Sequence, residues 1–198
     1  MPTPEYILSL REKIGHDLLW LPGATAVVLH EGRILLGRRA DNGNWAPITG
    51  IVDPGEEPAA AAVRECLEEA GVVCEVEGLA GVKAGGEVVF PNGDRCRFLD
   101  HTFRCRYVSG TARVNDDEST EIDWFDLDDL PPMREDLLRR IRCAMDFDGT
   151  TRFSTEPGPS QDPRAPTSRL GAESRRAAPA SEEDGDGSRS AGRISAAR

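Results

Sequence analysis

The sequence predicts an α+β fold, a sandwich of helices around a mixed β-sheet, and three observations support this prediction. Apolar, β-branched runs occur in pairs joined by tight turns, at Glu31-Gly32 and at Asn92-Gly93, which is typical of β-hairpins. Helical patterns are interspersed with these runs, without the repeated strand–helix–strand units of a parallel fold. With 198 residues, 38% of them hydrophobic, the chain has material for one domain with one modest core.

The first expected element is an amphipathic helix within residues 1–22. Thr3 can serve as its N-cap, and Pro4 suits the first helical position. Its apolar side chains recur at helical spacing at Ile7, Leu10, Ile14, Leu18 and Leu21. The first hairpin follows, with strands around residues 27–29 and 34–36.

The rest of the domain adds two helices and further strands. An alanine-rich helix follows the Pro- and Gly-rich stretch after Gly50, and the second hairpin spans residues 86–108. Residues 121–127, EIDWFDL, form a further expected strand. The closing helix lies within residues 132–147, with an apolar stripe made of Leu137, Leu138, Ile141, Ala144 and Met145. We therefore expect the main domain over residues 23–148.

Beyond this domain the composition changes. Residues 149–198 are rich in Pro, Gly, Ser, Ala and charges of both signs, with Phe153, Leu170 and Ile194 as the only large apolar residues. Such a segment buries too little surface to offset the entropy cost of ordering. We expect a disordered, low-complexity tail there, either inert or partner-binding.

Charge and cysteine content limit the classes of function. The net charge is −11, and residues 150–198 hold eight arginines against seven acidic residues, which leaves −12 for the first 149. A surface this negative repels nucleic acid polymers and anionic membranes, and it binds a small phosphate substrate only with the help of a cation. No apolar run reaches membrane-helix length and the N-terminus lacks a signal-peptide pattern, so we expect a soluble, cytoplasmic protein. The five scattered cysteines predict neither a disulfide framework nor a structural zinc site.

Three glutamates share one side of the alanine-rich helix. At about 100° per residue, Glu65, Glu68 and Glu69 span an arc of about 100°. The other side, which we expect to pack, consists of Ala62, Val63, Cys66, Leu67 and Ala70. Like charges at these spacings destabilise a helix by about a few tenths of a kcal/mol per pair, and a bound cation would reverse that cost. Carboxylate ligands suit a hard divalent ion, Mg²⁺ or Mn²⁺.

The residues around this helix follow a fixed spacing. From Gly50, five residues lead to Glu56, and seven more lead to RECLEEAGV, residues 64–72. The pattern resembles the Nudix hydrolase signature, Gly-x5-Glu-x7-Arg-Glu-U-x-Glu-Glu-x-Gly-U, where U is aliphatic and Cys66 is a departure. A solvated charged face is the alternative for the glutamates alone, but it does not explain the whole spacing. Over residues 23–130 the resemblance implies a Nudix-type α/β/α sandwich that hydrolyses a nucleoside diphosphate linked to another group.

The resemblance also implies roles for the signature residues. By analogy, Glu65, Glu68 and Glu69 hold one or more Mg²⁺ ions, with Mn²⁺ as an alternative. Glu56 is expected to pair with Arg64 and so to orient the helix and its Glu65. A bound ion of this kind activates water for attack on a phosphorus atom.

Two residues outside the signature receive roles by the same analogy, and two arginines are candidates from their position at the end of an expected strand. The carbonyl just before the box commonly ligates metal in this family, and Thr49, which stands where relatives often have glycine, offers it through its backbone. Glu118 matches a loop carboxylate that serves as a further metal ligand or general base, and a solvated acidic turn over residues 116–121 is the alternative. Arg38 and Arg39 are candidate donors to substrate phosphates, with ordinary surface arginines as the alternative.

The substrate is the least specified part of the prediction. The chain resembles the ADP-ribose pyrophosphatase-like branch of small bacterial Nudix proteins, which favours an ADP-ribose-like small nucleotide. A house-cleaning nucleoside triphosphate pyrophosphatase is the first alternative, and a non-catalytic nucleotide sensor, against which the intact glutamates argue, is the second. Trp45 and Phe90 are candidates for stacking on a base, with packing as the alternative. The three histidines receive no role, and the oligomeric state, including a homodimer, stays open.

Overall fold

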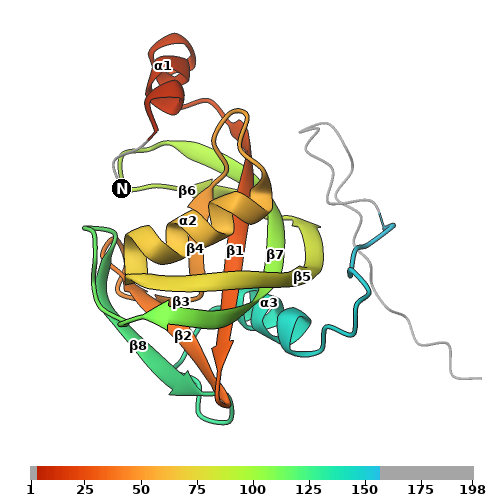
Figure 1. Ribbon diagram of the computed structural model, residues 1–198. Helices are drawn as coiled ribbons and strands as arrows, with labels where there is room; N and C mark the ends of the chain where they lie inside the picture. Colours follow the sequence, from red (N-terminus) through yellow and green to blue (C-terminus); the bar gives the residue numbers. More distant parts are fainter. Residues whose placement is uncertain (1–3, 157–198) are drawn as a thin grey trace, which may run out of the picture. The chain divides into compact units, whose positions relative to one another are not determined.

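Residues 4–156 are described by the computed structural model (Figure 1). Their elements, in chain order, are α1 (Glu5–Ile14), β1 (Leu19–His30), β2 (Arg33–Arg39), β3 (Trp45–Ala46), β4 (Ile48–Ile51), α2 (Pro58–Ala70), β5 (Val72–Ala84), β6 (Val88–Val89), β7 (Arg95–Gly110), β8 (Ser119–Asp126) and α3 (Glu135–Met145). Within this part of the chain, no helix is long and apolar enough to cross a membrane.

The strands form one mixed sheet. Its main path runs β3-β2-β1-β7-β5, while β4 pairs with β1, β6 with β7 and β8 with β2. β1 and β7 are parallel, and the other pairings are antiparallel. The long parallel pair β1–β7 therefore lies at the centre of the main path.

Helices cover both faces of this sheet. On β1, Val28 belongs to a core cluster that includes Cys66 of α2, whereas its neighbour Val27 belongs to a second cluster that includes Ile141 of α3. Successive side chains of a strand point to opposite faces, so α2 and α3 pack on opposite sides of the sheet. The predicted α+β sandwich with a mixed sheet is confirmed.

Both predicted hairpins are present. β1 and β2 pair at Leu29 with Ile34, and the turn residues Glu31 and Gly32 have φ angles of 47° and 76°. Positive φ at both central positions is the twist that a two-residue hairpin needs. The second turn, at Asn92-Gly93, joins β6 to β7.

The N-terminal helix is shorter than expected. α1 ends at Ile14, and the backbone from Leu19 onward belongs to β1, where Leu21 faces Phe98 of β7 in parallel register. The helical prediction for Leu21 is therefore wrong, because strand pairing with β7 outweighs the helical spacing of a few leucines. The expected N-cap, Thr3, lies outside the described residues.

The segment after α3 pairs with the edge of β5. The Arg152 N–H donates to the Ala80 carbonyl at 2.8 Å, and the Arg152 carbonyl accepts from the Val82 N–H at 2.9 Å. The Thr151 hydroxyl donates to the Leu79 carbonyl at 2.8 Å. The edge of β5 thus pairs with a short segment just beyond the expected boundary after Asp148. The rest of the expected tail, residues 157–198, lies outside the described residues.

Candidate active site

The helix α2 turns two of its three glutamates toward the sheet. It begins with Pro58 and packs against β4, β5 and β1. Glu65 and Glu69 are only 4% and 6% exposed, whereas Leu67 is 51% exposed. The expected facing of the helix is therefore wrong in part, since two of the three glutamates lie on the packed side and Leu67 lies on the solvent side.

A glycine on β4 makes this facing possible. A Cβ atom at Gly50 would overlap the carboxylate of Glu65. Only a residue without a side chain lets the β4 backbone approach the helix this closely. The first glycine of the signature thus has a steric reason, and it fixes where the Glu65 carboxylate lies.

Arg64 organises three of the signature carboxylates. Its Nε and Nη2 donate to the two carboxylate oxygens of Glu56 at 2.8 and 2.9 Å. Its Nη1 donates to Glu65 Oε1 at 2.8 Å and to Glu68 Oε2 at 2.9 Å, and Nη2 also reaches the Ile51 carbonyl at 3.2 Å. The hydrogen bonds from Arg64 hold the pKa of Glu56 below its ordinary value. The expected Glu56–Arg64 pair is present, and Arg64 also contacts Glu65 directly.

The pKa values of the two buried glutamates, Glu65 and Glu69, are shifted in the opposite direction to that of Glu56. Burial raises the pKa of Glu65 to about 7 despite the nearby Arg64. Burial, followed by repulsion from Glu118 and Glu65, raises the pKa of Glu69 to about 8. The Oε1 atom of Glu69 is buried without a hydrogen-bond partner among the described residues. In their charged form these carboxylates are therefore under-compensated.

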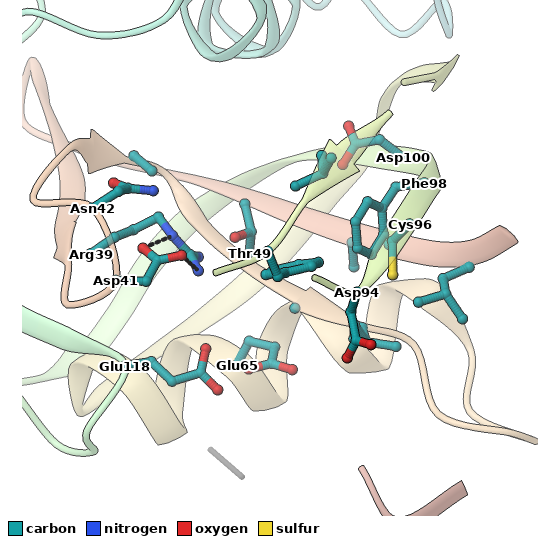
Figure 2. A pocket seen from close by; sticks show the side chains of 18 of the residues that line it. Arg39, Asp41, Asn42, Thr49, Glu65, Asp94, Cys96, Phe98, Asp100 and Glu118 are labelled. Carbon is teal, nitrogen blue, oxygen red and sulfur yellow. Dashed lines mark hydrogen bonds and ion pairs between the residues drawn. The ribbon is translucent and has the colours of Figure 1, made fainter. Parts of the chain in front are cut away.

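Glu118 joins this group from a distant part of the chain. It lies in the bend before β8, where its carbonyl accepts from the Ala40 N–H at 2.8 Å and its N–H donates to Asp116 Oδ1 at 3.0 Å. Its charge raises the pKa of both Glu65 and Glu69, and Figure 2 shows Glu118 and Glu65 along the same side of the pocket. The structure thus brings the predicted loop carboxylate to α2.

The donor set fits a divalent cation, although no ready-made metal cage is present. In residues 4–156, no three His, Cys, Asp or Glu side chains are already gathered into a metal-binding group. The unpartnered Glu69 oxygen and the crowded carboxylates are nevertheless what a hard cation would satisfy. Thr49, on β4 opposite Thr25 of β1, lines the same cleft.

Thr49, Glu65 and Glu118 line a cleft of about 660 Å³, whereas Glu68 and Glu69 are not among the residues described as lining it. In Figure 2, Thr49 and Glu65 lie near the middle, Arg39 and Glu118 lie to one side, and Phe98 lies to the other. The cleft is long enough to bring residues of α1, β7 and α3 into its lining. It has the size of a small-molecule site.

The two predicted phosphate-binding arginines are placed differently. Arg39 lines the cleft, and its Nε and Nη2 each donate to a carboxylate oxygen of Asp41 at 3.0 Å. Arg38 lies outside the described lining of the cleft, where it donates to Glu121 Oε1 at 2.5 Å and to the Gly43 carbonyl at 3.1 Å. The structure therefore brings Arg39 to the site and leaves Arg38 on a neighbouring surface.

The aromatic candidates also separate. The ring of Trp45 packs edge-on against Phe125, with 4.7 Å between ring centroids, whereas Phe90 lines the cleft. Sequence reasoning missed the contribution of α1, which places Ile7 and Arg11 in the cleft lining. The available signal was an arginine beside the apolar stripe of that helix, four residues after Ile7.

Comparison with known proteins places the chain in one enzyme family. The family model described as the NUDIX domain matches residues 20–144. The chain therefore belongs to the Nudix family, and it is a pyrophosphohydrolase of that family.

Individual relatives support this placement. The chain is 35% identical over 145 residues to a MutT-like protein of Streptomyces ambofaciens, covering 73% of this chain and 88% of that protein. It is 33% identical over 134 residues to an ADP-ribose pyrophosphatase of Methanocaldococcus jannaschii, covering 64% of this chain and 76% of that protein. The solved structure of a MutT NUDIX hydrolase from Burkholderia pseudomallei has a TM-score of 0.53 at 30% identity, over 62% of this chain and 96% of that one.

Proposed function

We propose that this Nudix hydrolase requires a divalent cation and cleaves the diphosphate bond of a nucleoside diphosphate linked to another group, with ADP-ribose as the favoured substrate. The observation that supports it most is the buried carboxylate group of Glu65 and Glu69, with an unpartnered oxygen on Glu69 and Glu118 close by. A cation is the simplest ligand that relieves the charge crowding at these carboxylates.

The residues that would hold Mg²⁺ or Mn²⁺ are Glu65, Glu68, Glu69, Glu118 and the carbonyl of Thr49. When bound, the ion neutralises charge on the diphosphate oxygens and lowers the pKa of a water molecule that attacks phosphorus. Arg64 keeps the Glu65 carboxylate oriented through the hydrogen bond at 2.8 Å. Gly50 keeps that carboxylate at the sheet.

Other residues of this chain supply proton transfer and phosphate contacts. Glu118, anchored by its backbone to Ala40, is a carboxylate at the cleft that can accept the proton of the attacking water. Arg39 can exchange its contacts with Asp41 for charge-assisted hydrogen bonds to a phosphate oxygen. Positioning and electrostatic stabilisation are thereby divided among separate elements.

Two considerations favour a diphosphate substrate over a triphosphate. The first 149 residues carry a net charge of −12, so each added phosphate increases repulsion. One relative bears the name ADP-ribose pyrophosphatase. Attack on phosphorus would convert ADP-ribose to AMP and ribose 5-phosphate.

Hydrolysis assays in ¹⁸O-labelled water test the proposal. With Mg²⁺, we expect ADP-ribose to be cleaved with label in a product phosphate, and we expect no turnover in EDTA. Label found only on the ribose C1 hydroxyl would contradict attack on phosphorus. Much faster cleavage of dGTP than of ADP-ribose would contradict the substrate choice, and full turnover in EDTA would contradict the cation requirement.

A further inference from the structure

The cleft extends beyond the part of the chain that defines the family. The family match begins at residue 20, yet Pro4, Ile7 and Arg11 of the preceding segment line the cleft. The wall that α1 contributes is therefore separate from the signature helix and from the matched domain. Elements of this kind are where relatives with one chemistry acquire different ligand preferences.

One side chain holds α1 in place. Arg11 donates from Nη2 to the Arg95 carbonyl at 2.9 Å and from Nη1 to the Asp17 carbonyl at 2.6 Å. Its Nε lies 3.3 Å from Asp94 Oδ1, and the Arg11 side chain is only 10% exposed. Because Asp94 and Arg95 belong to the β6–β7 hairpin and its turn, Arg11 fixes α1 against that hairpin.

The end of the cleft beside α1 is apolar and aromatic. Ile7, which is 4% exposed, packs in a small cluster with Cys96, and the partly buried rings of Phe90 and Phe98 pack against this cluster. Both rings also line the cleft. In Figure 2, Phe98 and Cys96 lie on the opposite side of the pocket from Arg39.

The two ends of the cleft suit the two halves of a nucleotide. Apolar rings offer no hydrogen bonds to a phosphate, and the charge of Asp94 at this end is paired with Arg11, whereas a planar base buries its faces on such rings. We propose that α1 and the β6–β7 hairpin form a nucleobase subsite, in which the base stacks against Phe90 and Phe98 while its phosphate extends toward Glu65. For the identity of the ligand as a nucleotide, this inference rests on the proposed function.

Equilibrium binding in EDTA separates this subsite from catalysis. AMP and ribose 5-phosphate both carry a ribose phosphate, but only AMP carries a base. We expect the native chain to bind AMP at least about tenfold more tightly than ribose 5-phosphate, and Phe90→Ala and Phe98→Ala each to weaken AMP binding by about tenfold. Binding of ribose 5-phosphate should not change in either variant.

Two further variants sharpen the test. Phe153→Ala removes an aromatic ring that is 74% exposed and lies outside the cleft lining, so it should leave both affinities unchanged. Arg11→Ala should loosen α1 and weaken AMP binding without affecting ribose 5-phosphate. Melting curves in the same buffer identify any variant whose loss of AMP affinity comes from unfolding. If Arg11→Ala unfolds, the two phenylalanine variants still test the subsite.

The outcomes distinguish this inference from the proposed function. Unchanged AMP binding in both phenylalanine variants, or an equal loss for the two ligands, would overturn the subsite even if ADP-ribose is hydrolysed. Base-dependent binding in a protein that does not hydrolyse ADP-ribose would support the subsite and overturn the proposed reaction.

Discussion

Glu56 and Glu69 are both signature carboxylates, but they lie in opposite environments. Glu56 accepts two hydrogen bonds from Arg64, which hold its pKa below the ordinary value. Glu69 is buried near Glu65 and Glu118, which raises its pKa to about 8, and one of its oxygens has no hydrogen-bond partner in the described chain. The paired Glu56 stabilises the fold. The buried Glu69 is held in the folded state at a cost to stability, which a bound ligand can offset.

The largest expected effect is on catalysis. Glu69→Gln should lower turnover of ADP-ribose by at least about a hundredfold, because the carboxylate that we propose as a cation ligand is lost. In EDTA its melting temperature should stay the same or rise, because repulsion among the buried carboxylates falls. Steady-state kinetics and melting curves measure both.

A matched control is available at the other end of the same helix, at its N-cap position. Glu57→Gln changes an exposed residue whose side chain makes no capping hydrogen bond, so turnover should match that of the native chain. Equal turnover by Glu69→Gln and Glu57→Gln at saturating Mg²⁺ would remove Glu69 from the ligand set.

The same substitution at Glu56 should instead act on stability. Glu56→Gln weakens a partly buried, charge-assisted pair with Arg64, which we expect to cost about 1 kcal/mol. For a domain of this size the melting temperature should fall by about 2–4 °C. An increase in melting temperature would contradict the stabilising role of Glu56.

The pH dependence of stability should further distinguish Glu56 from the two buried glutamates. Glu65 and Glu69 have folded pKa values of about 7 and about 8, above the ordinary 4.5, so the metal-free folded protein retains protons that the unfolded chain releases. Their contribution to stability is complete below about pH 4.5 and is lost as the pH rises through 7 to 8. Glu56, whose pKa is lowered, contributes above pH 4.5 and loses that contribution only in acid.

Melting temperatures in EDTA between pH 5 and 8.5 check this prediction. The native chain should lose stability across that range, and Glu69→Gln should lose less. Identical slopes for the two proteins would show that Glu69 does not carry the effect.

The sequence predicted local features of the site better than its three-dimensional arrangement. The Glu56–Arg64 pair could be predicted because the signature spacing places both residues around one helix start. The burial of Glu65 could not, because it depends on Gly50 of β4 allowing the helix to approach the sheet. Helical spacing alone gives the relative angles of side chains, not the direction of the sheet.

Two other differences have the same origin in tertiary structure. Arg38 and Arg39 looked equivalent in the sequence, but the pairing of β2 with β8 shifts register between them, and only Arg39 lines the cleft. The N-terminal segment continued a helical pattern to Leu21, but pairing with β7 makes Leu21 part of a strand. Such contacts between distant segments are not encoded in local periodicity.

Cation binding to the metal-free protein tests the central claim most directly. Calorimetric titration of the native chain and of Glu69→Gln with Mn²⁺ or Mg²⁺ at pH 7 requires no assumption about substrate. We expect the native chain to bind the ion with release of protons, because raised-pKa carboxylates must ionise to become ligands. Affinity should fall at least about tenfold in Glu69→Gln. Equal affinity and equal proton release in the two proteins would contradict the assignment of the buried glutamates as the cation site.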